Sequence, residues 1–157
     1  MRIFITGGAG FIGKNLVPAL IGHELLCLSH SRKIESVNQN LKIINGDLNK
    51  SESYIDELES FKPDCCIHLA WYGLPDYSVE NSAKNLLAGI GLIENLVNIG
   101  CKKIFIAGSC WEYGNAQGEV KESDELVQPE IFASFKTSLQ VISESICKES
   151  STHLLWG

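Results

Sequence analysis

The stretch TGGAGFIG at positions 6–13 is the first segment whose residue types and spacing indicate a chemical function. It follows an apolar run and opens a helical pattern, and its glycines fit both G-x-G-x-x-G and G-x-x-G-x-x-G. Such glycines allow a tight turn and a close approach of pyrophosphate, while the free N–H groups of the helix start face the phosphate charge. The pattern therefore predicts a dinucleotide site, with a merely tight strand-to-helix turn as the alternative. The expected contacts are Gly7, Gly10, Phe11, Ile12 and Gly13.

The end of the second apolar run indicates which dinucleotide binds. The run ELLCLS ends at Ser29, where an acidic residue would accept hydrogen bonds from a ribose 2′-OH. Arg32 and Lys33 follow, and a hydroxyl with two cations suits a 2′-phosphate, which a carboxylate would repel. We therefore expect NADP, with NAD as the alternative, and contacts from Ser29 and Arg32. Arg32 and Lys33 could instead be ordinary residues of a solvated loop.

Short apolar runs alternate with helical stretches along the 157 residues, which suffice for one domain with its own core. The expected strands are residues 2–6, 24–29, 41–45, 65–70, 102–108 and 152–156. The expected helices cover Phe11 to Ile21, about Ser51 to Ser60, about Val79 to Ile99, and the segment FASFK at 132–136; Asn115 to Gln128 is an irregular segment. Strands that are apolar on both faces predict a single α/β domain, a doubly wound parallel sheet flanked by helices.

The net charge and the cysteine content limit which classes of binding partner and which cellular environment we expect. The net charge is −6 and the basic residues are scattered, which argues against binding to nucleic acid or an anionic membrane. The N-terminus is a poor signal peptide and no apolar run approaches a membrane span, so we expect a cytoplasmic protein. The six cysteines show no CxxC or metal-ligand spacing, so we expect reduced core thiols and no metal. Cys110 is the exception, because it lies beside a candidate site.

Six features, in order along the chain, carry a resemblance to a known family. They are the glycine loop, NGDL at 45–48, HLAW at 68–71, Asn85, GSCWEYG at 108–114 and Lys136. With them the sequence resembles the extended short-chain dehydrogenase/reductases, specifically the NAD(P)-dependent epimerase/dehydratase family that acts on nucleotide sugars. The resemblance implies a Rossmann-type fold and hydride transfer at a sugar carbon. It also implies that Asp47 and Leu48 meet the adenine, and that Leu69 and Ala70 lie near the cofactor's phosphates and riboses.

The resemblance also implies the reacting groups. Ser109 would polarise the sugar carbonyl, a helical tyrosine would be the acid/base, and a lysine four residues later would bind the nicotinamide ribose. Positions i and i+4 share a helix face, and a nearby ammonium favours a phenolate, whose unperturbed pKa is roughly 10. Lys136 fits this geometry, but Phe132 stands at the tyrosine position and has no proton to transfer. Alternatively, FASFK is an amphipathic helix start that packs Phe132 and Phe135 into the core.

Two departures from the family pattern shape the expected function. Family 4,6-dehydratases follow the Ser/Thr with an Asp-Glu pair, whereas Cys110 and Trp111 follow Ser109 here, which favours epimerisation or carbonyl reduction over dehydration. The sequence stops directly after the last expected strand. We therefore expect the N-terminal part only, with the substrate-binding portion missing, a nucleotide sugar bound only by a longer form, and a homo-oligomer built on the exposed sheet edge. The alternative is a non-catalytic dinucleotide-binding or interaction protein.

Four other residues near these motifs have less specific expectations. His68 ends an apolar run and is expected to be a core histidine with a satisfied hydrogen bond. Trp71, Tyr72 and Trp111 either line the sugar side of the cleft or pack as aromatic core.

Overall fold

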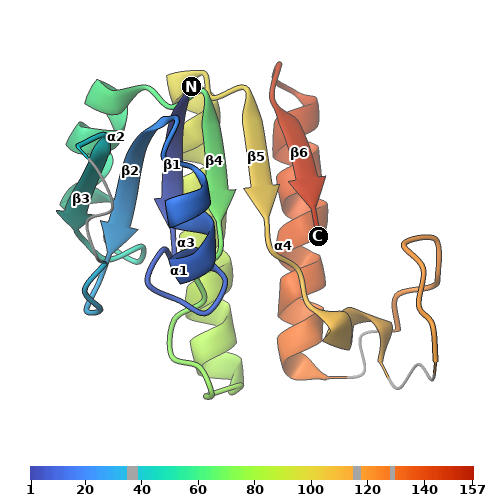
Figure 1. Cartoon of the computed structure of the whole chain (residues 1–157). Helices are drawn as coiled ribbons and strands as arrows, with labels where there is room; N and C mark the ends of the chain where they lie inside the picture. Colours follow the sequence, from blue (N-terminus) through green and yellow to red (C-terminus); the bar gives the residue numbers. More distant parts are fainter. Residues whose placement is uncertain (35–38, 115–117, 128–129) are drawn as a thin grey trace.

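A computed structural model describes residues 1–34, 39–114, 118–127 and 130–157. Its strands form one parallel sheet in the order β3-β2-β1-β4-β5-β6 (Figure 1). The strands are β1 (Arg2–Thr6), β2 (Glu24–Ser29), β3 (Leu41–Asn45), β4 (Cys65–His68), β5 (Lys103–Ile106) and β6 (His153–Trp156). The strand order reverses between β1 and β4, and open α/β sheets bind ligands beyond the carboxyl ends of the strands at such a point.

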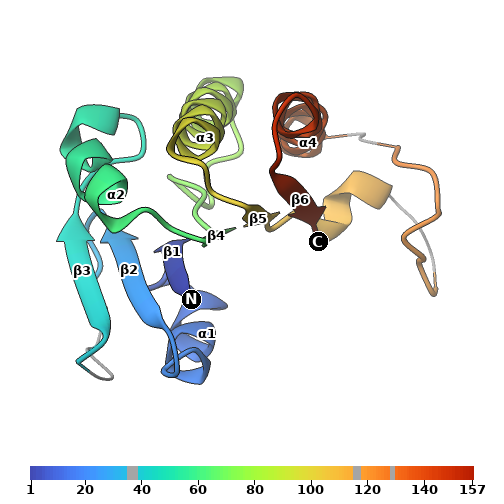
Figure 2. The same cartoon turned by 90° about the horizontal axis from the view of Figure 1, so that it is seen from above.

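Helices cover both faces of this sheet, as Figure 2 shows from above. Helices α2 (Ile55–Phe61), α3 (Val79–Ile99) and α4 (Ile131–Lys148) lie on one face, and α1 (Gly13–Ala19) lies on the other. Two short 3-10 turns are η1 (Ser51–Ser53) and η2 (Cys110–Tyr113). The prediction of a Rossmann-type doubly wound parallel sheet is therefore confirmed.

The two faces of the sheet bury separate apolar clusters, because successive strand residues point to opposite sides. Phe4, Leu26 and Cys66 point to the face of α2, α3 and α4, where they join Leu92 and Leu139 in the larger cluster. The cluster on the α1 face is smaller and consists of Ile3, Ile5, Val17, Leu25, Cys27 and Ile34. Helix α1 thus packs on β1 and β2 and holds the loop that precedes it against the sheet.

The sequence-based bounds are correct for β1, β2, β3 and α3. Helix α3 begins after Ser78, whose side chain accepts a hydrogen bond from the Asn81 N–H, and ends at Gly100 with φ +87°. The expected helix from Ser51 to Ser60 is instead split at Tyr54, whose backbone leaves the helical region with φ −145° while its ring is buried. The expected irregular segment has no helix or strand over 118–127, and its residues 115–117 and 128 lie outside the described residues.

Other elements are shorter than the sequence indicates, at the end of the sheet where the site lies. Helix α1 begins only at Gly13, so Phe11 and Ile12 belong to the preceding turn, and it ends soon after Pro18, which has no N–H to donate. Strand β4 ends at His68 and β5 at Ile106. Leu69 and Ala70, which follow β4, line a cavity at this end of the sheet.

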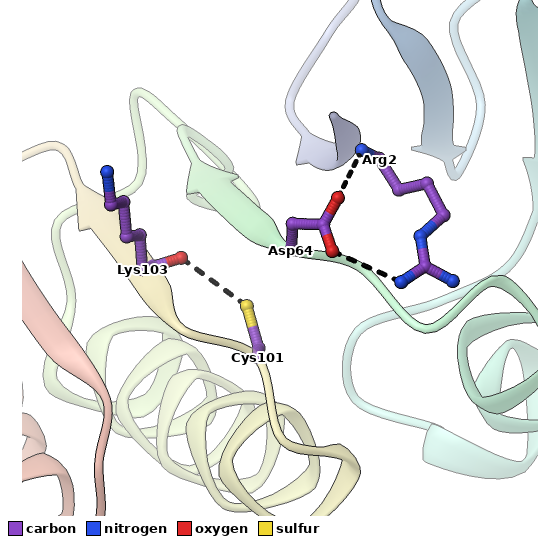
Figure 3. A network of polar contacts seen from close by, with 4 residues as sticks. All are labelled: Arg2, Asp64, Cys101 and Lys103. Atoms are coloured by element: carbon purple, nitrogen blue, oxygen red, sulfur yellow. Dashed lines mark hydrogen bonds and ion pairs between the residues drawn. The ribbon is translucent and has the colours of Figure 1, made fainter.

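At the opposite end of the sheet, an ion pair joins the starts of β1 and β4 (Figure 3). The Asp64 carboxylate accepts a hydrogen bond from the Arg2 backbone N–H at 2.8 Å and from its guanidinium at 3.1 Å. These hydrogen bonds hold the pKa of Asp64 below its ordinary value. Figure 3 also shows the Cys101 thiol donating to the Lys103 carbonyl at 3.4 Å. None of the helices in the described part of the chain is long and apolar enough to cross a bilayer.

Candidate dinucleotide cavity and reaction side

A cavity of about 550 Å³ opens at the carboxyl ends of β1, β2, β3 and β4. Its volume is in the range of small-molecule and cofactor sites, and its position is the one expected for an open α/β sheet. Eleven of the residues predicted to contact the cofactor line it: Gly7, Gly10, Phe11, Ile12, Gly13, Ser29, Arg32, Asp47, Leu48, Leu69 and Ala70. Lys136, the remaining predicted contact, is not among the lining residues. The structure thus gathers segments from four strand ends around one space.

The glycines of the loop after β1 are required by close backbone contacts. Gly7 has φ +73°, and a Cβ there would lie 2.7 Å from the Ala70 nitrogen. A Cβ on Gly13 would lie 2.4 Å from the Gly7 carbonyl oxygen, which itself accepts a hydrogen bond from the Gly10 N–H at 2.9 Å. The backbone therefore closes into a tight turn that lines the cavity, a position that fits a pyrophosphate.

The end of β2 presents one polar and one cationic side chain to the cavity. Ser29 is buried and its hydroxyl donates to the Arg32 carbonyl, which rounds the turn after the strand. Arg32 is exposed and lines the cavity, whereas the equally exposed Lys33 is not among the lining residues. The structure thus separates the two cations that the sequence treats as a pair.

Asp47 and the segment after β4 form the other walls. Partial burial raises the pKa of Asp47, but hydrogen bonds from the Asn49 N–H at 3.0 Å and from its side chain at 3.1 Å outweigh it and hold this pKa below the ordinary value. The buried Asn85 accepts from the Tyr72 N–H at 2.6 Å and donates to its carbonyl at 3.0 Å. These two hydrogen bonds attach the chain after β4 to α3, so Asn85 has a structural role at the cavity.

The second group of predicted site residues, Ser109, Phe132 and Lys136 with their neighbours, is called the reaction side after its predicted role. Ser109 lies after β5 and caps the start of η2. Its N–H donates to the Glu112 carboxylate at 2.8 Å, and its hydroxyl oxygen accepts from the Trp111 N–H at 3.3 Å. Ser109 and Glu112 form a capping box. Ser109 is half-buried, so its side chain stays within reach of the surface at the end of β5.

Lys136 is a buried cation on α4, with only 6% of its surface exposed. Its Nζ donates to the Ala107 carbonyl at 2.6 Å and lies 4.5 Å above the Trp71 ring and 5.9 Å from the Trp156 ring. Burial lowers the pKa of Lys136 to about 8, against the opposing effect of the Glu112 charge. Trp71 also lines the cavity, so one residue contacts both the dinucleotide cavity and the ammonium group.

Phe132, one turn before Lys136, is buried in a cluster of aromatic rings. Its ring meets those of Trp71 at 5.3 Å, Tyr77 at 5.3 Å and Trp111 at 5.5 Å between centroids, all near perpendicular. The alternative of an amphipathic helix start that packs into the core is therefore realised for Phe132, while Phe135 is only half-buried and Ser134 is exposed. Phe132 and Lys136 nevertheless share one helix face, which is the geometry that the i, i+4 spacing predicts.

His68 is confirmed as a core histidine. It is 4% exposed and its Nδ1 lies 2.6 Å from the Thr6 hydroxyl oxygen. Burial, together with the nearby Lys136 charge, lowers the pKa of His68 to about 3, so the ring is neutral. All six cysteines carry free thiols, with Cys110 exposed. The described residues contain no cluster that could hold a metal ion.

The sequence assigned no role to Glu112, Tyr77 or Trp156 on the reaction side. Glu112 is buried and its second carboxylate oxygen accepts from the Trp156 indole at 3.0 Å. The S-x-x-E spacing from Ser109 is the signal that could have found it. Nothing local in the sequence places Tyr77 or Trp156 here, because both arrive from segments that are distant along the chain.

Fold and site together define a Rossmann-type α/β domain whose cavity lies at the strand-order reversal. Residues 3–156 match the model of the NAD dependent epimerase/dehydratase family, and the chain belongs to this family.

Three similar proteins illustrate the relationship. The chain is 28% identical to a bifunctional UDP-glucose 4-epimerase and UDP-xylose 4-epimerase from Pisum sativum, over 74% of this chain and 39% of that protein. It is 29% identical to the dTDP-4-dehydro-6-deoxyglucose reductase of Escherichia coli, over 94% of this chain and 51% of that protein. The solved structure of MoeE5 in complex with UDP-glucuronic acid and NAD matches with a TM-score of 0.80 and 27% identity, over 100% of this chain and 53% of that one. The chain thus spans about half the length of these relatives, or less.

Proposed function

We propose that this chain is the dinucleotide-binding part of an enzyme that transfers hydride at a carbon of a nucleotide sugar, as an epimerase or a reductase. The observation that carries the proposal is a cavity lined together by the glycine loop, the ends of β2 and β3 and the chain after β4. Family membership and the NAD and UDP-sugar complex of a similar structure support it. Titration of the chain with NADPH and NADH, followed by nicotinamide fluorescence, tests it: saturable binding is expected, and no binding of either would reject it.

NADP is the proposed cofactor, with NAD as the alternative. Ser29 ends β2 where a carboxylate would otherwise meet the ribose 2′-OH, and Arg32 lines the same part of the cavity. A guanidinium binds a phosphate with strong, charge-assisted hydrogen bonds. In the titration, NADPH should therefore bind more tightly than NADH. The reverse order would favour NAD.

The residues on the reaction side would hold the reactants. When bound, the nicotinamide supplies or accepts the hydride. We propose that Lys136 donates hydrogen bonds to the nicotinamide ribose once the Trp71 ring gives it access, because that ring now covers the ammonium group. Ser109, held by its capping box, would donate its hydroxyl proton to the sugar carbonyl oxygen. Cys110 and Trp111 after it favour epimerisation or reduction over dehydration.

Phe132 makes acid/base catalysis the weakest part of this machinery, and its packing favours the second candidate, a non-catalytic dinucleotide-binding protein. A phenyl ring enclosed by Trp71, Tyr77 and Trp111 has neither a proton nor a lone pair to exchange. In that protein, the glycine loop and Lys136 would serve binding alone.

Phe132→Tyr tests whether the site still favours a phenolate at this position. If it does, the new phenol should titrate below its unperturbed pKa of roughly 10, because the Lys136 charge stabilises the phenolate. Absorbance at 295 nm against pH, with Phe135→Tyr on the neighbouring half-buried position as the control, measures this. An added phenol in Phe132→Tyr that titrates no lower than the one in Phe135→Tyr would favour the non-catalytic protein.

A further inference from the structure

The Glu112 carboxylate links the groups of the reaction side, and neither the proposed hydride transfer nor cofactor binding uses it. Only 3% of the residue is exposed. One carboxylate oxygen accepts from the Ser109 N–H at 2.8 Å, and the other accepts from the Trp156 indole N–H at 3.0 Å. A single buried side chain thereby ties the residue that follows β5 to the edge strand β6.

The surrounding backbone is shaped to admit this carboxylate. A Cβ on Gly108 would lie 2.5 Å from the Trp156 indole nitrogen and 3.1 Å from the nearer Glu112 oxygen. The Glu112 carbonyl also accepts from the Val127 N–H at 2.9 Å, which attaches the far end of the acidic segment 118–127. Glycine at 108 is thus required for the carboxylate and the indole to meet directly behind the backbone of Ser109.

Glu112 and Lys136 also share Trp156 as a neighbour, because its indole N–H donates to the Glu112 carboxylate at 3.0 Å and its ring lies 5.9 Å from the Lys136 ammonium. The Lys136 ammonium lies among the rings of Trp71 and Trp156, where burial disfavours a cation. Two titratable side chains face it from the packed elements, His68 from β4 and Glu112 from η2. His68 is neutral near pH 7, because its pKa is about 3, so Glu112 supplies the negative charge that opposes the effect of burial on Lys136.

We propose that Glu112 is a positioning residue of the reaction side, whose carboxylate fixes the backbone at Ser109 and keeps the Lys136 ammonium charged for the cofactor ribose. The proposal rests on the proposed cofactor site for the ribose contact. The coupling between Glu112 and Lys136 does not require a bound cofactor and is therefore measurable in the chain alone.

Two variants separate the charge of Glu112 from its hydrogen bonds. Glu112→Gln removes the charge and keeps an oxygen for the Ser109 N–H, but it loses the acceptor for the indole. Trp156→Phe, the matched control, removes the indole donor and keeps the charge. Far-UV and near-UV circular dichroism verify that both fold.

Lys136 is then titrated by NMR in chains labelled with 13C-lysine, using the Cε signal that Lys136→Arg removes. We expect a midpoint near pH 8 in the wild type and in Trp156→Phe, and a midpoint about 1 pH unit lower in Glu112→Gln. Equal midpoints in Glu112→Gln and Trp156→Phe would overturn the proposal. If Glu112→Gln fails to fold, Glu112→Asp replaces it, because the shorter side chain moves the carboxylate charge away from Lys136. The Lys136 midpoint is then expected to fall, and an unchanged midpoint overturns the proposal.

A binding measurement connects this coupling to the cofactor. Relative to the wild type, Glu112→Gln should lose about tenfold in NADPH affinity at pH 8.5 and much less at pH 6.5, because one pH unit changes the charged fraction of Lys136 up to tenfold. A loss that is equal at both pH values would overturn the role at the ribose. If the wild type binds neither NADPH nor NADH at pH 6.5, the proposed cofactor function fails, while the NMR titration still decides whether Glu112 controls Lys136.

Discussion

The cavity side of this molecule is formed mainly by backbone, whereas its reaction side is formed by buried side chains. The cavity side, at the ends of β1, β2 and β3, is shaped by glycines and main chain, and its lining side chains Phe11 and Arg32 are exposed. The reaction side, between β5, β6 and α4, is a buried cluster of rings around one cation, Lys136, and one carboxylate, Glu112. Trp71 belongs to both, since it lines the cavity and covers the ammonium.

This difference separates the two parts of the proposed function, cofactor binding and acid/base catalysis. Binding through a backbone turn depends on where main-chain N–H groups point, and many side-chain replacements leave it intact. The proposed acid/base catalysis would depend on a single phenol oxygen, which the Phe132 side chain lacks.

Gly13→Ala should have the largest effect, because it breaks the cavity side at its tightest point. The new Cβ would meet the carbonyl oxygens of Gly7 and Gly8 at 2.4 and 2.6 Å, and backbone atoms cannot move aside as a flexible side chain would. We expect a loss of about 3 kcal/mol in the free energy of unfolding, together with loss of NADPH binding. Urea denaturation measures the first. Gly22→Ala, where nothing lies within 4 Å, is the control and should change stability by less than about 0.5 kcal/mol.

Lys136→Met tests whether the reaction side contributes to binding at all. We expect at least a tenfold loss of NADPH affinity at pH 7, because a charge-assisted hydrogen bond to the ribose disappears. The wild-type affinity should also fall as the pH rises through about 8, where Lys136 loses its proton, while the variant shows no such fall. A wild-type profile that matches the variant would confine cofactor binding to the cavity side.

Stability should show the opposite pH dependence. The pKa of Lys136 falls from 10.5 to about 8 on folding, so between these values the unfolded chain binds more protons than the folded one. The free energy of unfolding of the wild type, relative to Lys136→Met, should therefore rise from pH 8 to pH 10. Thermal unfolding of both chains over this range measures the difference.

Arg32→Ala tests whether a side chain of the cavity side makes a specific contact with NADPH. We expect about a tenfold loss in NADPH affinity and little change for NADH, because only NADPH presents a 2′-phosphate. Lys33→Ala is the matched control, since Lys33 is exposed but does not line the cavity. If Lys33→Ala weakens NADPH binding as much as Arg32→Ala, the two cations act as a general positive surface and the specific contact is wrong.

Asp64→Asn should have the smallest effect, because its ion pair with Arg2 is at the opposite end of the sheet and is exposed to solvent. The folded-state pKa of Asp64 is lowered, so its contribution to stability is present above the ordinary carboxyl pKa of 3.8 and is lost as the pH falls through the folded value. Thermal unfolding should show a small difference at pH 7 that shrinks in acid and in high salt. Cofactor affinity should not change.

Much of the fold was predictable from the sequence because its signals are local. The bounds of α3 agree to the residue, since a Ser cap, a helical period and a terminal glycine all agree there. The start of α1 was not predictable, because Phe11 and Ile12 fit a helical pattern but are held in the preceding turn by the contacts of Gly7, Gly10 and Gly13. The end of β4 was also missed, since apolar Leu69 and Ala70 read as strand while they edge the cavity.

Residue types and their spacing were enough to predict the parallel α/β order and the glycine turn, and they place a phenyl ring at position 132. The tertiary structure alone places the Trp71 ring over Lys136, packs Tyr77 and Trp111 against Phe132, and joins Ser109 to Trp156 through Glu112. The physical reason is distance along the chain. Burial, ring contacts and the field at an ammonium group arise between segments that no local pattern relates.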